Sequence, residues 1–224
     1  MHIQVSKLSK SFGGQDVLKD VSFAINSGEK VALLGKNGSG KSTLFKILMG
    51  EETQDSGYVT FNPKTVQIGY LPKVADDNDP LSSMKKLKKR FREILISKPD
   101  VLLLDEPTNH LDWKGMTWLE KEVMAFTGPV LIVSHDRYFL DKIVDKVLEL
   151  EKGEVKVYGG NYSLYKQQKQ IELESHLRSY EKQQKQIQKL QADLLEKRNT
   201  VQKGGTDAPP TRDKDKFAAS FFAN

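Results

Sequence analysis

The segment that most constrains this chain is the glycine-rich stretch Gly35–Ser42, with the sequence GKNGSGKS. It follows an apolar run at residues 31–34 and precedes a helical pattern at residues 43–49. A strand, a glycine-rich loop and a helix in this order are the context of a phosphate-binding loop. Glycines let backbone N–H groups approach phosphate oxygens, Lys41 would neutralise the β- and γ-phosphates, and the Ser42 hydroxyl would bind Mg²⁺. The residues expected around the phosphates are Gly35, Lys36, Asn37, Gly38, Ser39, Gly40, Lys41, Ser42 and Thr43.

Length and composition limit what can surround this loop. With 224 residues, the chain has room for one large domain, alone or with an appendage. Hydrophobic residues make up only 38% of the chain, so part of it is expected to lie outside a core. The absence of cysteine excludes disulfides, thiolate metal sites and a thiol nucleophile. No apolar run approaches the roughly 18 residues of a membrane span and no signal peptide is visible, which predicts a soluble, cytoplasmic protein.

The N-terminal third has the pattern of short strands joined by turns. Apolar and polar residues alternate in residues 1–30, and Gly13-Gly14 marks a turn between two strands. Further strands are expected at residues 57–61 and 67–71. Phe12 lies just before the first turn, and its ring has two interpretations. It could stack on an adenine base, or it could be an ordinary core residue.

Two uninterrupted apolar runs, residues 101–104 and 130–133, have the pattern of buried parallel strands. The first run leads into Asp105 and Glu106, and the second leads through a serine to His135. Ligands bind at the carboxyl ends of such strands, and a buried acidic pair requires a cation. We therefore expect Asp105 to hold Mg²⁺, Glu106 to activate the attacking water, and His135 to contact the γ-phosphate or that water. The alternative is an acidic pair that only caps the next turn.

A helix is expected from about Leu81 to Leu95, because apolar residues recur there at helical spacing. The opposite face of this helix is basic and carries Lys85, Lys86, Lys88, Lys89, Arg90 and Arg92. These side chains could bind phosphate, or they could form a solvated surface. Two more helices are expected at residues 113–126 and 137–143, followed by a β-hairpin at 146–158.

The composition changes from about residue 161 onward. Glutamine, lysine and glutamate dominate residues 161–203, and no proline or glycine interrupts them, which predicts one long helix. The basic residues of this segment supply most of the net charge of +5. Its apolar residues are sparse, so the helix should need a partner helix. Residues 204–224 are expected to form a loop and part of a second helix.

Together, these motifs resemble an ATP-binding cassette over residues 1–160. The sequence DEPTNHLD at residues 105–112, with SHDRYFL at 134–140, is similar to the ABC-F group of cassette proteins. The resemblance implies an α/β fold of the P-loop NTPase type. This fold has a mostly parallel core sheet and an N-terminal antiparallel β subdomain, and here a long C-terminal helix would follow. The resemblance also implies ATP and Mg²⁺ as ligands and assigns Phe12 to the adenine base.

Members of the ABC-F group are soluble, carry two cassettes in one chain and act on the ribosome. A helical linker between their cassettes reaches toward tRNA, and residues 161–203 resemble the start of that linker. The resemblance therefore implies the ribosome and tRNA as partners of the basic helix. ATP in this family lies between two cassettes, so it also implies a second cassette, in a homodimer or in a separate chain. Ser82 and Asp112 are expected to face that cassette.

The chain departs from the family pattern in three places. Only about eight residues precede Leu81 after the strand at 67–71, so the helical subdomain around residues 74–98 is much shortened. The signature sequence, normally Leu-Ser-Gly-Gly-Glu, aligns with Leu81–Lys85 and loses its glycines and its carboxylate. The glutamine that senses Mg²⁺ in the family is replaced by Lys73, whose ammonium cannot ligate a metal. We therefore expect binding of Mg·ATP but slow hydrolysis by the chain alone.

Three functions stay open at this point. The chain could be an ABC-F-like ATPase that serves translation or protects the ribosome from antibiotics. It could be the ATPase subunit of a transporter, although the groove for a membrane partner would need the helical subdomain. It could also be a degenerate cassette that binds ATP without hydrolysing it. The sequence is compatible with a fragment of a two-cassette protein.

Overall fold

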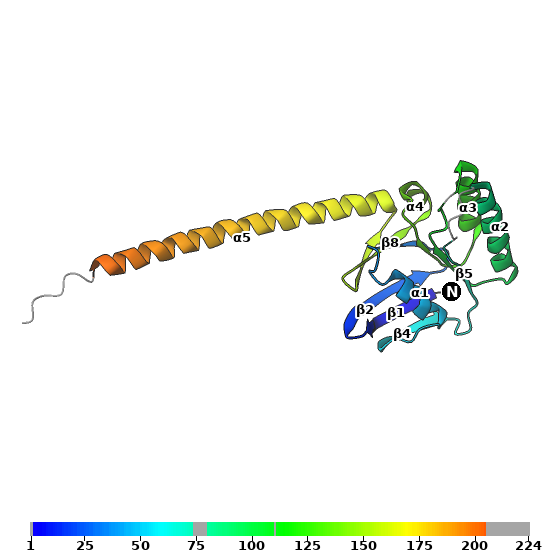
Figure 1. The fold of residues 1–224 in the computed structure, drawn as a ribbon, viewed down its shortest axis with the longest axis horizontal. Coiled ribbons are helices and arrows are strands. Elements are labelled where there is room, and N and C mark those ends of the chain that lie inside the picture. The colour runs from blue at the N-terminus through cyan, green and yellow to red at the C-terminus, as the bar shows by residue number, and fades with distance from the viewer. Residues whose placement is uncertain (1, 74–79, 110, 205–224) are drawn as a thin grey trace, which may run out of the picture. The chain divides into compact units, whose positions relative to one another are not determined.

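The computed structural model describes residues 2–73, 80–109 and 111–204 (Figure 1). Contacts within the chain divide it into two units, residues 1–169 and residues 170–224. Of the described elements, the first unit contains the strands and the first four helices. The second contains most of one long helix. Within the described residues, no helix combines the length and the apolar character that a membrane crossing requires.

The N-terminal strands form a small antiparallel sheet. It contains three strands in the order β2-β1-β4, namely β1 (His2–Phe12), β2 (Gln15–Asn26) and β4 (Ser56–Asn62). Alternation in β1 buries Ile3 and Val5, and after an irregularity at Lys7, which has a φ of 46°, Leu8 is buried as well. The expected N-terminal antiparallel subdomain is confirmed, although its first two strands are long rather than short.

The larger sheet has six strands in the order β5-β6-β7-β3-β8-β9. Its neighbouring strands run parallel except for the antiparallel pair β8-β9 at one edge. The strands are β3 (Lys30–Leu34), β5 (Ile68–Leu71), β6 (Val101–Asp105), β7 (Val130–Val133), β8 (Lys146–Glu151) and β9 (Glu154–Gly159). This confirms the expected P-loop NTPase class with a mostly parallel core sheet.

Both faces of the larger sheet are covered, so successive strand residues pack into two different cores. Leu103 belongs to the core shared with the antiparallel sheet and α1, and Leu102 and Leu104 belong to the core beneath the other helices. Figure 1 shows this division, with α1 near β1 and with α2 and α3 together on the other side. The helices are α1 (Lys41–Met49), α2 (Pro80–Ile96), α3 (Trp113–Ala125) and α4 (Arg137–Ile143). This double burial explains the uninterrupted apolar runs in the sequence.

Helix α2 packs on the sheet through the apolar face that its periodicity predicts. Leu87 and Phe91 are fully buried, and the Phe91 ring meets the Trp118 ring edge to face with centroids 5.7 Å apart. Lys88 lies over the Trp118 ring, with its Nζ 5.1 Å from the centroid. The other basic side chains of α2 are exposed, as a solvated surface would be. Among the described residues, α2 is the one helix between β5 and β6.

The expected long helix is present as α5 (Tyr162–Gly204). Its first turns belong to the first unit, where Tyr165 is buried and stacks edge to face on Tyr158 at 5.1 Å. The Tyr165 hydroxyl donates to Glu149 Oε1 at 2.8 Å, and Lys169 Nζ donates to Glu149 Oε2 at 2.6 Å. These contacts fix the base of the helix to β8. The expected loop and second helix at 204–224 fall, from residue 205 on, outside the described residues.

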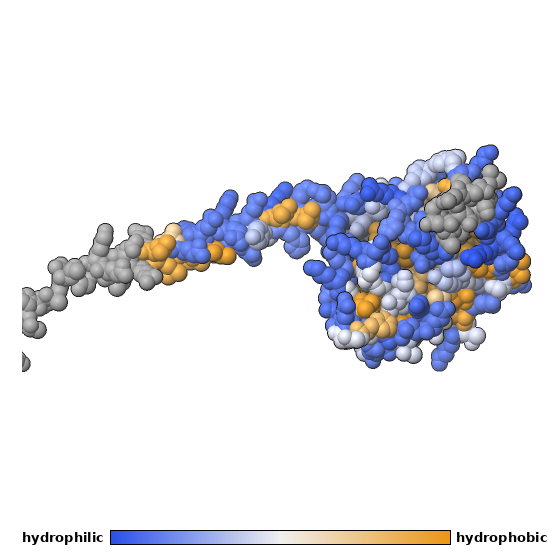
Figure 2. Space-filling view, viewed as in Figure 1, coloured by the Kyte–Doolittle hydropathy of each residue, from blue (hydrophilic) through white to orange (hydrophobic). Residues whose placement is uncertain are grey.

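Beyond residue 169, α5 is largely polar. Its described apolar side chains are all about half exposed or more, and Figure 2 shows them as patches on an otherwise hydrophilic helix. They are Ile171, Leu173, Leu177, Ile187, Leu190, Leu194 and Leu195.

Candidate nucleotide-binding site

The glycine-rich loop connects the end of β3 to the start of α1, as the sequence predicts. Gly40 caps α1 with a φ of 107°, and a Cβ there would lie 3.0 Å from the side chain and the carbonyl oxygen of Val17. A Cβ on Gly35 would lie 2.5 Å from the carbonyl oxygen of Leu150. Both positions therefore require glycine, one for its backbone angle and one for its close contact with β8.

The Lys41 side chain folds back onto the start of the loop and donates hydrogen bonds to its backbone. Its Nζ donates hydrogen bonds to the carbonyl oxygens of Gly35 at 2.7 Å and Lys36 at 3.0 Å. Burial lowers the pKa of the Lys41 ammonium, and the nearby carboxylates of Glu106 and Asp105 oppose that shift. The ammonium is thus already placed beside the loop amides that would receive phosphate oxygens.

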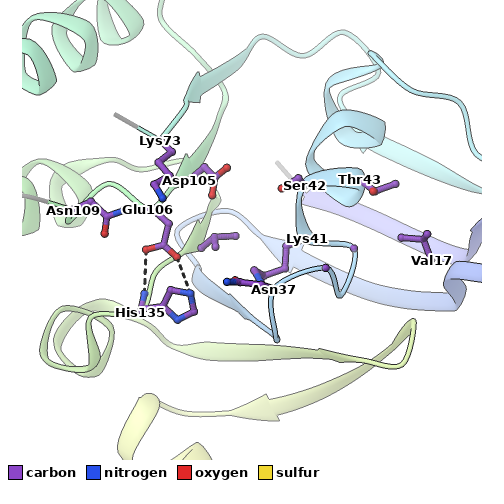
Figure 3. Close-up of a pocket in the computed structure, with 13 residues that line it drawn as sticks. Val17, Asn37, Lys41, Ser42, Thr43, Lys73, Asp105, Glu106, Asn109 and His135 are labelled. Carbon is purple, nitrogen blue, oxygen red and sulfur yellow. Dashed lines mark hydrogen bonds and ion pairs between the residues drawn. The ribbon is translucent and has the colours of Figure 1, made fainter. Parts of the chain in front are cut away.

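The acidic pair and the histidine meet at the ends of two adjacent strands. Leu104 pairs with Ile132 in the parallel β6-β7 ladder, so the residues that follow both strands emerge side by side. The backbone N–H of His135 donates to Glu106 Oε2 at 3.3 Å, and His135 Nε2 lies 3.3 Å from Glu106 Oε1 (Figure 3). Glu106 has a φ of 48°, which is unusual for a residue with a side chain. Such strain is typical of functional sites.

These groups line one cavity of about 570 Å³ (Figure 3). The lining residues are Val17, Asn37, Gly38, Gly40, Lys41, Ser42, Thr43, Lys73, Asp105, Glu106, Asn109, Val133 and His135. The cavity is hollowed between the loop and the strand ends, where parallel sheets place their ligands. Its size is within the usual range for small-molecule sites.

The positive charges near the two carboxylates of the cavity do not offset the effect of burial on their pKa values. Burial raises the pKa of Asp105, and the positive charges of Lys41 and Lys73 only partly oppose this rise. Burial also raises the pKa of Glu106, against the opposing effect of His135. Desolvation therefore dominates at both groups, and an added cation would stabilise their ionised forms.

Comparison with known proteins identifies the family. A family model described as ABC transporter matches residues 18–92, and a second model with the same description matches residues 148–201. The putative ATP-binding protein YdiF of Bacillus subtilis is 32% identical over 296 residues, covering 96% of this chain and 46% of that protein. ABC transporter F family member 2 of Arabidopsis thaliana is 29% identical over 270 residues, covering 83% of this chain and 40% of that protein. The chain belongs to the ABC-F group of ATP-binding cassette proteins.

Further comparisons agree with this assignment. The ribosome protection protein VmlR of Bacillus subtilis is 33% identical over 215 residues, covering 86% of this chain and 39% of that protein. A solved structure of an ATP-binding subunit of an ABC transporter shares the cassette fold, with a TM-score of 0.56 at 20% identity. It covers 71% of this chain and 90% of that chain.

The cassette chain spans less than half the length of these curated relatives. The alignment with YdiF is 296 residues long, whereas this chain has 224. YdiF therefore contains residues within the matched region that have no counterpart here.

Nine of the predicted site residues line the cavity of the cassette, including Asp105, Glu106 and His135. Gly35, Lys36 and Ser39 do not line it, and they line a second cavity together with residues of β8. Phe12 does not line it either. Phe12 is 47% exposed, and Lys10 Nζ lies 5.0 Å from the centroid of its ring.

The two residues expected to face a second cassette lie at the N-terminus of α3 and in α2, and their partner-facing role stays a prediction. Asp112 is exposed and caps α3, where its Oδ1 accepts a hydrogen bond from the Gly115 N–H at 2.7 Å. This contact gives Asp112 a structural role in the single chain. Ser82 lies in the first turns of α2, and its side chain is outside the described part of the structure.

Four lining residues were not among the predicted site residues. Asn109 belongs to the DEPTNHLD sequence, and Lys73 was recognised only as a departure from the family. The sequence therefore drew attention to both positions. Nothing in the sequence indicated that Val17 and Val133 line the cavity, because an apolar residue in a strand looks like any core residue. Their place in the cavity depends on how the strands pair.

The cassette site fits Mg²⁺ in its donor set. Asp105 supplies a carboxylate and Ser42 a hydroxyl at the same cavity, and both are hard oxygen ligands. Among the described residues there is no group of three or more histidine, aspartate or glutamate side chains that could hold a metal. Mg²⁺ usually takes only one or two protein ligands together with substrate phosphates, so this sparse set suits it.

The desolvation of Asp105, which is partly buried, should destabilise the nucleotide-free cassette at neutral pH. The pKa of Asp105 is raised by folding, so its favourable contribution is present at low pH and is lost as pH rises through that raised pKa. We expect an Asp105→Asn variant to melt a few degrees above the wild type at pH 7.5. This difference in melting temperature should shrink as the pH is lowered toward about 4, the ordinary pKa of aspartate. Thermal melts across pH measure this, with the exposed Asp193→Asn as a charge-matched control. A lower melting temperature for Asp105→Asn at pH 7.5 would contradict the prediction.

Proposed function

We propose that this cassette binds Mg·ATP at the cavity between the loop and the strand ends. The observation that carries the proposal is the convergence of Lys41, Asp105, Glu106 and His135 on one cavity with the glycine-rich loop. The loop amides and Lys41 would bind the phosphates, and Thr43 lies at the same end of α1. Phe12 would stack on the adenine from the β1-β2 hairpin.

Ser42 and Asp105 would hold the metal ion, which when bound would neutralise charge on the β- and γ-phosphates. Glu106 would accept a proton from the attacking water, because its carboxylate is fixed by the His135 backbone and lies in a desolvated site. The His135 imidazole is mostly exposed and lies beside the same carboxylate, where it could orient the water or the γ-phosphate. These roles make the cassette a candidate ATPase.

Hydrolysis by the chain alone should be slow. The sequence that would close over ATP from a second cassette, Leu81–Lys85, lacks the family glycines. Efficient turnover would then need a second cassette, in a homodimer or in a separate chain, facing Ser82 and Asp112. A turnover of several per second by the purified monomer would contradict this proposal.

The proposed site of action is the ribosome in the cytoplasm, through the basic helix α5 and tRNA. The support is the similarity to VmlR, which is named a ribosome protection protein, and the excess of basic residues in α5. Basic helices bind nucleic acid phosphates by charge. The role could be in translation or in antibiotic resistance.

Sedimentation with ribosomes tests this proposal. A Glu106→Gln variant should bind ATP but not hydrolyse it, so it should stay in the ATP-bound state. We expect this variant to sediment with ribosomes in the presence of ATP and to remain in the supernatant without ATP. Glu154→Gln makes the same change on an exposed residue away from the cavity and should sediment only as much as the wild type does. No ATP-dependent sedimentation of Glu106→Gln would count against ribosome action.

A non-hydrolysing, ATP-dependent binding module is the second candidate function. The presence of Lys73 in the cavity favours it, since an ammonium cannot ligate a metal. The ATPase rates of the wild type and Glu106→Gln distinguish the two functions. Equal rates would favour the binding module, and a faster wild type would favour the enzyme. Titration calorimetry that shows no binding of Mg·ATP would overturn both.

A further inference from the structure

Lys73 reaches the cavity because of how β5 pairs. Leu71 at the end of β5 is opposite Leu104 in the parallel β5-β6 ladder. The chain therefore leaves β5 beside the point where β6 ends, and Lys73 emerges next to Asp105 and Glu106. Figure 3 shows its side chain directed toward these carboxylates, and it lines the same cavity.

The cavity thus contains two lysines in different positions relative to the acidic pair. Lys41 comes from the loop and Lys73 from the end of β5 (Figure 3). Both positive charges act on Asp105. A lysine ammonium donates three hydrogen bonds and accepts none, so Lys73 can bind a phosphate oxygen or a carboxylate but cannot coordinate a metal.

An ammonium at this position would have two consequences for a bound triphosphate. It supplies positive charge to the phosphates without a metal, as a cation does at phosphoryl groups generally. It also competes with Mg²⁺ for the Asp105 carboxylate. Both effects reduce the advantage that the metal gives to binding.

We propose that Lys73 is a second phosphate-binding cation, and that it makes ATP binding by this cassette only weakly dependent on Mg²⁺. The inference rests on the proposed ATP site, and it concerns the contribution of a residue that the family pattern would not supply. Charged hydrogen bonds contribute about 1.5–3 kcal/mol, so removing one should weaken binding roughly 10- to 100-fold where no metal replaces it.

Titration calorimetry with ATP, in EDTA and in saturating MgCl₂, tests this proposal. We expect the wild type to bind ATP in EDTA within about tenfold of its affinity in MgCl₂. Lys73→Gln should lose about tenfold or more in EDTA and much less in MgCl₂. Lys73→Arg keeps the charge and should retain binding in EDTA. The exposed Lys64→Gln, outside the cavity, should behave as the wild type.

The outcomes separate this inference from the proposed function. If Lys73→Gln and the wild type have the same ratio of affinities in EDTA and MgCl₂, Lys73 has no such role, although the ATP site stands. If Lys73→Arg binds as poorly in EDTA as Lys73→Gln, the effect is one of side-chain shape and the proposal fails. If the wild type binds no ATP even in MgCl₂, the proposed function itself is overturned.

Discussion

A Lys41→Ala variant should lose about 100-fold or more in affinity for Mg·ATP. The Lys41 ammonium lies inside the loop and would reach two phosphate groups, and each charged hydrogen bond contributes about 1.5–3 kcal/mol. The loss has a second source in the free cassette. Without the ammonium, the carbonyl oxygens of Gly35 and Lys36 lose their donor, so the loop would be less ordered before ATP binds.

Titration calorimetry in MgCl₂ measures this loss. Lys46→Ala is the matched control, because Lys46 is on the same helix α1 but is exposed and outside the cavity. It should bind ATP as tightly as the wild type. The two variants should melt within a few degrees of the wild type, so that a large difference in affinity does not come from unfolding. If Lys41→Ala binds ATP within threefold of the wild type, the phosphates do not occupy this loop.

The loop and the acidic strand end were predictable from sequence because their constraints are local. The order of strand, glycine loop and helix places Lys41 and Ser42 at the start of α1 without any knowledge of the rest of the fold. The meeting of Asp105 with His135 needed only one further rule, that adjacent parallel strands end at the same edge of a sheet. Composition alone was enough to predict α5.

Other features depend on pairing between distant strands and were not predictable. β4 and β5 follow each other in the sequence, yet they belong to different sheets. Val17 lines the cavity because the β1-β2 hairpin packs against Gly40, and nothing in its local sequence indicates that contact. Sequence patterns give the type of an element more reliably than its partner.

The shortened connection before α2 is the clearest case where sequence alone left a question. The resemblance to the family predicts a larger helical subdomain, and its loss could have left α2 without a place to pack. In the structure, α2 contacts β5, and Leu87 and Phe91 are buried in the core beneath α3. The cassette core is therefore closed by α2 despite the short connection.

This packing predicts a large effect of truncating Phe91. The Phe91 side chain is fully buried and meets the Trp118 ring at 5.7 Å, so alanine would leave a cavity at the junction of α2 and α3. Such changes cost about 3–5 kcal/mol in free energy of unfolding, a large fraction of the usual total of about 5–15 kcal/mol. We expect Phe91→Ala to lose stability by that amount, and Phe91→Leu to lose clearly less, because leucine leaves a smaller cavity.

Urea unfolding followed by tryptophan fluorescence measures this loss, since Trp118 is in contact with Phe91. It reports on the cassette and not on α5, which has no tryptophan. Ile96→Ala is the matched control, because Ile96 is on the same helix but is 78% exposed, and it should change stability by about 0.5 kcal/mol or less. If Phe91→Ala unfolds at the same urea concentration as Ile96→Ala, α2 does not pack on the sheet. The shortened connection would then have detached it from the core.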